Sequence, residues 1–206
     1  ALDAVESGRF DEEIAPVTIP GRKGGTTEFA RDEAPKPTPY ETLAKMKPAF
    51  QKDGKGTAGN ASIISDGASA VVVMSDTKAA ELGITPIARV GAQASTGLDM
   101  KYVLVAPILA IPKCLDKAGM NTHDVDLYEV NEAFSGSTVA VIRELGLNTD
   151  RVNVNGGSVA LGHPIGASGA RVLTTLLYEM ARRDVKTGLA SLCLGGGEAV
   201  AMTVHR

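Results

Sequence analysis

The segment Gly162–Gly169, with the sequence GHPIGASG, places a histidine among small residues that leave space around its ring. A histidine that only packs against its neighbours does not need such space, and imidazole titrates close to neutral pH. His163 is therefore the first candidate for a group that takes and returns protons. His123, in a polar turn, and His205, near the last residue, are interpreted as structural.

The second candidate is Cys193, which ends an apolar run and comes just before three glycines, Gly195–Gly197. Backbone N–H groups in a glycine run can stabilise an oxyanion, and cysteine, histidine and an oxyanion pocket together are typical of covalent acyl transfer. On the residues alone, Cys193 is the predicted nucleophile. Cys114 has apolar neighbours on a predicted helix, and we interpret it as a small buried hydrophobic residue.

Asn131 is the third candidate, because it follows the apolar run 127–130 directly. An asparagine there either caps the next helix or presents a polar group at the end of a strand, and the residues alone leave both interpretations open. The glycine-rich run 156–169 lacks the Gly-Lys-Ser/Thr ending of a P-loop and also lacks the dinucleotide fingerprint, which excludes both nucleotide motifs.

The elements that must position these residues alternate along the chain from residue 88 onward. Strands are predicted at 88–95, 127–130, 152–154, 188–194 and 199–205, and helices near 109–118, 134–145 and 165–183. This βαβαβαββ order predicts an α/β fold with a mainly parallel sheet and helices on both faces. The carboxyl ends of the strands would then line the crevice in which the candidate residues meet.

The residues before this alternating part have a different character. Six of the ten prolines lie within residues 1–61, which predicts mostly loop with short helices and strands. Arg22 and Lys23 stand in a glycine-rich turn and are interpreted as a solvated or oligomer-contact turn rather than a phosphate site. Residues 70–74 are predicted to form a buried strand, and residues 76–82 a helix that begins with Asp76 as its cap.

Composition narrows the classes of protein. The chain has 206 residues, a formal net charge of −3 and 44% hydrophobic residues, which excludes a disordered tail or a fibrous protein. An acidic chain has no overall field for nucleic acid or an anionic membrane, so neither is an expected partner. Two cysteines and no apolar run of about 20 residues favour a reducing, cytoplasmic location. The acidic start, without Met, predicts no signal peptide and a chain cut from a longer one.

Four ordered blocks carry a specific resemblance: Asn131–Phe134, Asn153–Gly157, Gly162–Gly169 and Cys193–Gly197. They resemble the active-site blocks of the thiolases, most of all the short-chain acetyl-CoA acetyltransferases. The resemblance implies a thiolase-like fold, a βαβαβαββ mixed sheet with helices on both faces. The family's chain is about twice as long and has two such halves.

The resemblance also implies how this chain divides. Residues 1–61 would belong to the loop domain, 62–87 to the closing elements of the first half, and 88–206 to the complete C-terminal half. The nucleophilic cysteine of the family would lie outside this chain, in the N-terminal part.

The implied activity is the reversible Claisen condensation of two acetyl-CoA molecules to acetoacetyl-CoA and CoA. His163 would activate the nucleophile, and Cys193 would be an acid and base rather than the nucleophile. Asn131 would hold a water that stabilises the enolate oxygen together with His163, and the Gly195 N–H would contribute to an oxyanion hole. No metal or cofactor is expected, since the CoA thioesters are substrates.

The resemblance further implies a set of residues that contact coenzyme A: Ala49, Phe50, Ala58, Ala61, Ser62, Ala133 and Phe134. The implied partners are an N-terminal polypeptide that carries the nucleophilic cysteine and further copies in a homo-oligomer, expected to be a tetramer with Arg22 and Lys23 in an assembly loop. Two alternatives stay open. One is a degradative 3-ketoacyl-CoA thiolase for longer chains, and the other is a non-catalytic CoA-binding subunit.

Overall fold

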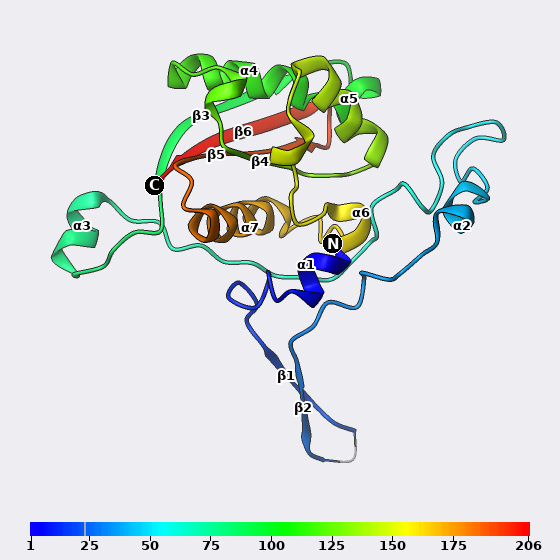
Figure 1. The fold of residues 1–206 in the computed structure, drawn as a ribbon, viewed down its shortest axis with the longest axis horizontal. Helices are drawn as coiled ribbons and strands as arrows, with labels where there is room; N and C mark the ends of the chain where they lie inside the picture. Colours follow the sequence, from blue (N-terminus) through cyan, green and yellow to red (C-terminus); the bar gives the residue numbers. More distant parts are fainter. Residues whose placement is uncertain (23) are drawn as a thin grey trace.

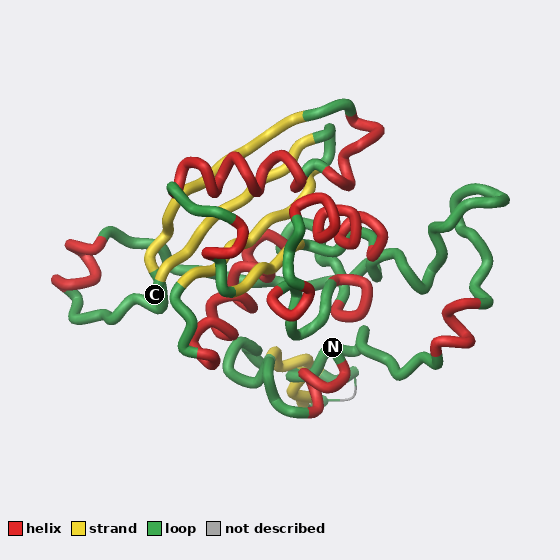
Figure 2. Tube along the Cα trace, turned by 45° about the horizontal axis from the view of Figure 1, so that its top comes forward, coloured by secondary structure: helices red, strands yellow, loops and turns green. Residues whose placement is uncertain are grey.

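A four-stranded sheet forms the centre of the computed structural model, which describes residues 1–22 and 24–206 (Figures 1 and 2). The strands are β3 (Arg89–Gly97), β4 (Leu127–Val130), β5 (Thr187–Leu194) and β6 (Glu198–His205), in the spatial order β3-β6-β5-β4. Only β4 and β5 are parallel, whereas β6 runs antiparallel to both β5 and β3. The sheet is therefore mixed, and the prediction of a mainly parallel sheet is wrong because β5 and β6 form a hairpin.

Helices cover both faces of this sheet, as predicted (Figure 1). The helices α4 (Pro107–Ala118) and α5 (Ser135–Leu145) lie over one face, and α7 (Ser168–Arg183) packs against β4 and β5 on the other. All four residues of β4 are buried, since the strand has a helix layer on each side. Cys114 is fully buried in the α4 layer, in agreement with its interpretation as a packing residue.

Glycines follow the two helices on the α4 face, directly after the predicted helix ranges 109–118 and 134–145. Gly119 follows α4 with a φ of 66°, and Gly146 follows α5 with a φ of 61°. In this left-handed conformation the backbone N–H of each glycine bonds to a carbonyl of the last turn, which glycine permits at low steric cost. These helix ends fix where the chain turns back toward β4 and toward the segment after α5.

The predicted strand at 152–154 does not form. Val152 makes a single bridge to Tyr128 of β4, and Asn153 then adopts a left-handed backbone with φ 48° that ends the pairing. The Asn153 side chain replaces the missing strand: its Oδ1 accepts from the Val130 N–H at 2.8 Å, and its Nδ2 donates to the Val130 carbonyl at 2.8 Å. An amide side chain therefore satisfies the end of a buried strand.

The predicted buried strand at 70–74 is also wrong in this structure. These residues belong to a long extended segment without a pairing strand, and Val72 is 85% exposed. A strand needs a hydrogen-bonded neighbour, and none of the described residues lies beside it in that role. The helix that follows, α3 (Asp76–Glu81), begins at the predicted residue, but its cap is not the predicted Asp76: the Ser75 hydroxyl accepts the Lys78 N–H.

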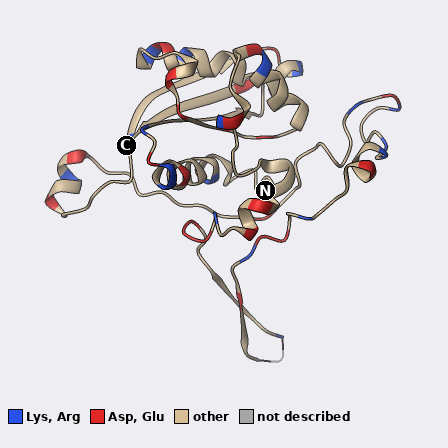
Figure 3. Cartoon of the chain, viewed as in Figure 1, with Lys and Arg blue, Asp and Glu red and all other residues tan. Residues whose placement is uncertain are grey.

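The first 61 residues are mostly loop, as predicted. Short elements interrupt the loop: α1 (Leu2–Glu6), β1 (Val17–Pro20), β2 (Thr26–Phe29), α2 (Tyr40–Ala44). The β1–β2 hairpin projects from the body of the molecule, and charged side chains are spread over the projecting loops rather than gathered in one field (Figures 1 and 3). Arg22 is exposed at the hairpin turn, and Lys23 lies outside the described residues.

Short helical turns complete the described fold: η1 (Met100–Val105), η2 (Thr122–Asp124), η3 (Thr149–Arg151) and α6 (Ser158–Leu161). Among the helices of the described ranges, none has the length and apolar character needed to cross a membrane.

The role of Asn153 can be tested by Asn153→Gly and Asn153→Ala. Loss of both side-chain hydrogen bonds to a buried strand should lower the free energy of unfolding by about 2 kcal/mol in the glycine variant. The alanine variant should lose about 1 kcal/mol more, because its Cβ is strained in the left-handed conformation. Urea unfolding measures both losses. The control is Asn148→Gly, which removes an exposed side-chain hydrogen bond from the Asp150 N–H. An equal loss of unfolding free energy in the control would contradict the role assigned to Asn153.

Candidate active site

The parallel pairing of β4 with β5 brings two of the candidate residues to one edge of the sheet. Val130 pairs with Ser191, and the Asn131 N–H continues the ladder by donating to the Ser191 carbonyl at 2.9 Å. Cys193 lies two residues beyond Ser191 on the same strand. Asn131 is buried and does not cap α5, whose N-cap is Phe134 without a side-chain hydrogen bond. The helix-cap interpretation of Asn131 is therefore wrong.

The ring of His163 is held between two side chains. Its Nε2 lies 3.3 Å from the Nδ2 of Asn131, and its Nδ1 lies 2.6 Å from the Oγ of Ser168. Its backbone N–H donates to the Ile63 carbonyl at 2.8 Å, which ties the glycine-rich segment to the extended segment that passes the site. The imidazole is thus held at both nitrogens. Such contacts are needed if the ring is to present one particular nitrogen to a substrate.

The contacts of Ser168 indicate which nitrogen carries the proton. The Ser168 hydroxyl donates to the Pro164 carbonyl at 3.0 Å, so it has no proton left for the imidazole and must accept from Nδ1–H. The Nε2 of His163 then carries the lone pair and accepts from the Asn131 amide. Burial lowers the pKa of His163, and the nearby Arg171 charge lowers it further. At neutral pH the ring is therefore uncharged, and Nε2 is the unprotonated nitrogen.

The amide of Asn131 has a second partner on its oxygen. The hydroxyl of Ser158, the first residue of α6, donates to the Asn131 Oδ1 at 2.8 Å. Ser158 is fully buried, so this hydrogen bond is shielded from water. Asn131 is consequently held by its backbone to β5 and by both ends of its side chain.

Cys193 stands near the end of β5, opposite Ala199 of β6, and is half-buried. Burial raises the pKa of its thiol, so the resting group is protonated at neutral pH. In the described part of the chain, no hydrogen bond joins Cys193 to His163 or Asn131. Gly195 is exposed in the turn between β5 and β6. The structure thus brings Asn131 and His163 into contact, and it places Cys193 on the strand that holds Asn131.

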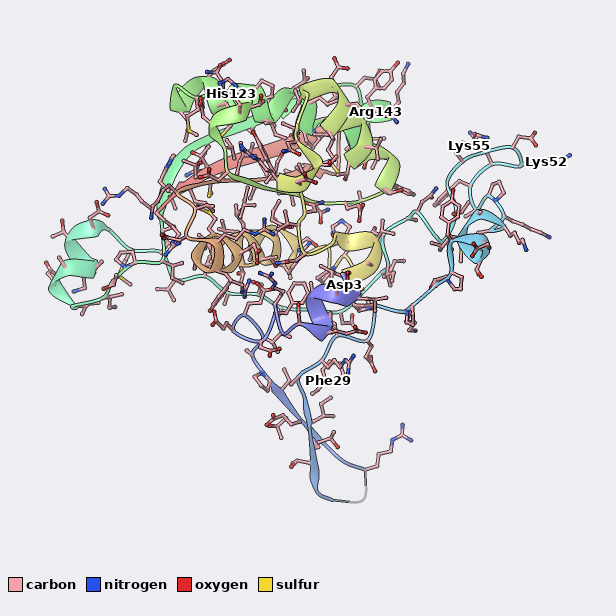
Figure 4. All side chains as sticks on the ribbon, in the orientation of Figure 1. Asp3, Phe29, Lys52, Lys55, His123 and Arg143 are labelled. Carbon is pink, nitrogen blue, oxygen red and sulfur yellow. The ribbon has the colours of Figure 1, made fainter. Side chains whose placement is uncertain are left out.

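The residues expected to contact coenzyme A form a second group next to the site. Ala61 bridges to Phe134, and the Ser62 N–H donates to the Ala133 carbonyl at 3.0 Å. The ring of Phe50 meets that of Phe134 edge-on, with centroids 5.7 Å apart. The remaining two residues, Ala49 and Ala58, are exposed on the projecting loop that also carries Lys52 and Lys55 (Figure 4). Five of the seven expected residues therefore lie in contact with one another.

Some residues of the site were not predicted from the sequence: Ser168, Ser158, and beneath them Glu129 and Arg171. Ser168 returns to His163 because the turn after Pro164 bonds the Ser168 N–H to the Pro164 carbonyl at 2.9 Å. The sequence does contain a feature that could have identified Glu129. It is an acidic residue in the middle of an apolar strand, and a buried acidic residue requires a partner. Glu129 is almost completely buried, and its Oε2 lies 3.8 Å from the Nη1 of Arg171.

Comparison with known proteins gives consistent matches over the chain. Family models described as the thiolase N-terminal and C-terminal domains match residues 1–77 and 84–206, respectively. The acetyl-CoA acetyltransferase of Pseudomonas aeruginosa is 55% identical over an alignment 207 residues long, which covers all of this chain and 53% of that protein. The acetyl-CoA acetyltransferase of Thiocystis violacea is 56% identical over 204 residues, 98% of this chain and 52% of the relative.

Solved structures agree with these matches. The crystal structure of the Bacillus anthracis acetyl-CoA acetyltransferase superimposes with a TM-score of 0.97 at 47% identity, over 100% of this chain and 52% of that one. Human mitochondrial 3-ketoacyl-CoA thiolase superimposes with a TM-score of 0.91 at 38% identity, over 99% and 51%. The chain therefore spans about half the length of its relatives, and with both thiolase domain models matched it belongs to the thiolase family.

Proposed function

We propose that this chain provides the acid–base half of the active site of an acetyl-CoA acetyltransferase, which condenses two acetyl-CoA molecules reversibly to acetoacetyl-CoA and CoA. The observation that supports this most is the placement of His163, whose Nδ1 is bonded to Ser168 and whose unprotonated Nε2 faces the Asn131 amide beside the strand of Cys193. A base in that state can take the proton of a thiol nucleophile at neutral pH. The relatives named above carry the proposed activity in their names.

In the proposed first half-reaction, a cysteine outside this chain attacks the thioester of one acetyl-CoA. His163 Nε2 takes the proton of that cysteine, and the bond between the acyl carbon and the CoA sulfur breaks. The departing CoA thiolate needs a proton, and Cys193 is protonated in the resting site because burial raises the pKa of its thiol. Donation of that proton leaves Cys193 as the thiolate, which is the form that acts as a base.

In the second half-reaction, the Cys193 thiolate removes a proton from the methyl carbon of a second acetyl-CoA. The enolate oxygen is stabilised by the His163 imidazolium and by a water held by Asn131, while the Gly195 N–H donates to an acyl oxyanion. The enolate carbon attacks the acyl-enzyme, and the nucleophilic cysteine leaves and regains its proton from His163. Protons and charges balance over one cycle, and no metal or cofactor takes part.

The cysteines of this chain support a nucleophile from elsewhere. Cys114 is fully buried, and its thiol donates to the Ala92 carbonyl, so it cannot reach a thioester. A hollow of about 1230 Å³ lies between the extended segment 65–76 and α7, and its lining includes neither His163 nor Cys193. Its wall carries the exposed apolar residues Val71–Val73. We infer that the N-terminal part of the protein packs over this hollow and its exposed valines, and carries the nucleophilic cysteine to His163 from outside it.

Assembly and location complete the proposal. The assembled unit would form a homo-oligomer, a tetramer, through the projecting β1–β2 hairpin, whose strand residues are all exposed. Both cysteines are free, which supports the cytoplasm as the compartment.

A second candidate function is the degradative cleavage of longer 3-ketoacyl-CoA thioesters. The superposition with human mitochondrial 3-ketoacyl-CoA thiolase favours it, because the same half of the fold is present there. Both functions use the same chemistry and differ in acyl chain length. Thiolysis rates of the complete protein with acetoacetyl-CoA and with a 3-ketoacyl-CoA of ten carbons distinguish them: the proposed function expects a clear preference for acetoacetyl-CoA.

The variant Cys193→Ser tests the proposed function directly. Serine keeps the shape of the side chain but holds its proton too firmly to act as the base, so carbon–carbon bond formation and cleavage should fall by at least about 10². Acyl transfer from acetyl-CoA to the cysteine outside this chain should still occur, since His163 remains and the departing CoA thiolate can take its proton from water instead of from residue 193. Peptide mass spectrometry after a rapid quench locates the acetyl group.

Wild type and variant should both carry the acetyl group outside this chain. Acetylation on the peptide that contains Leu192 and Cys193 would identify Cys193 as the nucleophile instead. A complete protein that binds acetyl-CoA but forms no adduct at all would favour the non-catalytic CoA-binding subunit.

Ser168→Ala tests the assigned state of His163. The variant removes the acceptor of Nδ1–H, which the imidazolium needs more than the neutral ring, so the pKa of His163 should fall further below its usual range. The acid limb of the pH profile for kcat/KM should move to lower pH, and the rate should drop by about tenfold because the ring loses its fixed orientation. His163→Ala sets the lower limit of rate. Ser7→Ala, which removes an exposed hydroxyl that bonds to the Ala4 carbonyl and not to any residue of the site, is the control. An unmoved acid limb in Ser168→Ala would refute the assignment.

A further inference from the structure

Arg171 lies behind the site and does not contact the imidazole. Its side chain comes from the first turn of α7, is 19% exposed, and donates from Nη2 to the Ser158 Oγ at 3.2 Å. Its Nη1 lies 3.8 Å from the Oε2 of the buried Glu129, which holds the guanidinium against β4. Among the described residues, Nε and Nη1 have no hydrogen-bond partner. The hydrogen bond to Ser158 is thus the one through which Arg171 reaches the site.

The contact between Arg171 and Ser158 indicates which groups of the site donate and which accept hydrogen bonds. A guanidinium has donors only, so the Ser158 oxygen must accept from Arg171. The single hydroxyl proton of Ser158 then goes to its other partner, the Asn131 Oδ1 at 2.8 Å.

With its oxygen turned to Ser158, Asn131 presents its Nδ2–H to the other side, where His163 Nε2 lies 3.3 Å away. A nitrogen that receives a hydrogen bond cannot carry a proton, so the proton of the neutral ring must be on Nδ1. The contacts of Ser168 on the opposite side of the ring require the same tautomer. Two independent sets of contacts therefore agree.

We propose that Arg171 is a positioning residue: through Ser158 it fixes the orientation of the Asn131 amide, and through that amide it holds His163 in the Nδ1–H tautomer. The use of this tautomer in catalysis rests on the proposed function. The positioning itself does not, because it concerns only groups within this chain. Without Arg171 the Ser158 hydroxyl loses the donor that fixes its oxygen, so its proton can turn away from Asn131. The Asn131 amide can then rotate and present its oxygen to His163, and the Nε2–H tautomer becomes accessible.

The charged groups around Arg171 determine which measurement can best test its positioning role. Carboxylates face it from several elements: Glu13 and Asp32 from the N-terminal loops, Glu129 from β4 and Glu132 from the segment after β4. Burial raises the pKa of Glu13 to about 7 and that of Glu129 to about 8, so both change charge near neutral pH. A pH profile alone would mix these titrations with that of His163. The direct readout is the position of the ring proton at a fixed pH.

The test uses the complete protein labelled with ¹⁵N-histidine, at pH 8, where His163 is neutral. In wild type the ¹⁵N chemical shifts should show a proton on Nδ1 and a lone pair on Nε2 of His163. In Arg171→Met we expect a measurable minor fraction of the molecules to carry the proton on Nε2, because Asn131 no longer selects a tautomer and only the contact with Ser168 still favours Nδ1–H. The thiolysis kcat should fall by the same fraction, with KM unchanged.

Ser158→Ala breaks the same connection with a smaller change, and it should give the same mixture of tautomers. Adding Arg171→Met to Ser158→Ala should produce no further change, since the connection is already broken. Arg182→Met is the control, as it removes an arginine from the same helix that bonds to Glu179 instead. A pure Nδ1–H signal in Arg171→Met or in Ser158→Ala would overturn the proposal. The outcome could also be a mixture of tautomers in the two variants together with no thiolase activity in the wild-type protein. That result would refute the proposed function and leave the positioning role intact.

Discussion

The hydrogen bond from the Asn131 N–H to the Ser191 carbonyl is the contact on which the site depends. It extends the parallel ladder of β4 and β5 by one residue, and the register of that ladder is set by the complete burial of β4 between two helix layers. A shift of one residue would turn Tyr128 and Val130 toward the wrong layer and would point Asn131 away from His163. The packing of the core therefore determines the geometry of the crevice, and helix packing far from the site contributes to its precision.

Burial acts on the two proton-transfer candidates in a complementary way. It lowers the pKa of His163 and raises the pKa of Cys193, so both groups are uncharged in the resting protein. Charge separation would begin only when a substrate brings a thioester into the crevice. The site thus avoids the cost of a permanent buried ion pair at its reacting edge. The ionisable pair that the chain does bury, Glu129 and Arg171, lies one layer behind.

Sequence patterns predicted the structural features that depend on neighbouring residues. They did not predict the contacts that depend on residues distant in the sequence. The stops at Gly119 and Gly146 and the bounds of β4 were predictable, because glycine chemistry and a short apolar run are local features. The segment 152–154 has the composition of a strand, yet the side chain of Asn153 takes over the pairing, a choice that only the position of Val130 explains. Ser168, Ser158 and Arg171 are ordinary residues in sequence. Their importance comes from the atoms that folding places within hydrogen-bond distance.

The same Asn153 has a consequence for how the molecule meets other chains. β4 is the last strand of the sheet, and such a strand normally offers a row of free N–H and C=O groups to any passing extended peptide. Here Val152, the Asn153 backbone and the Asn153 amide occupy those groups at Tyr128 and Val130. The sheet is thereby closed to growth at this border, so unwanted strand exchange or fibre-like stacking has no template beside the crevice.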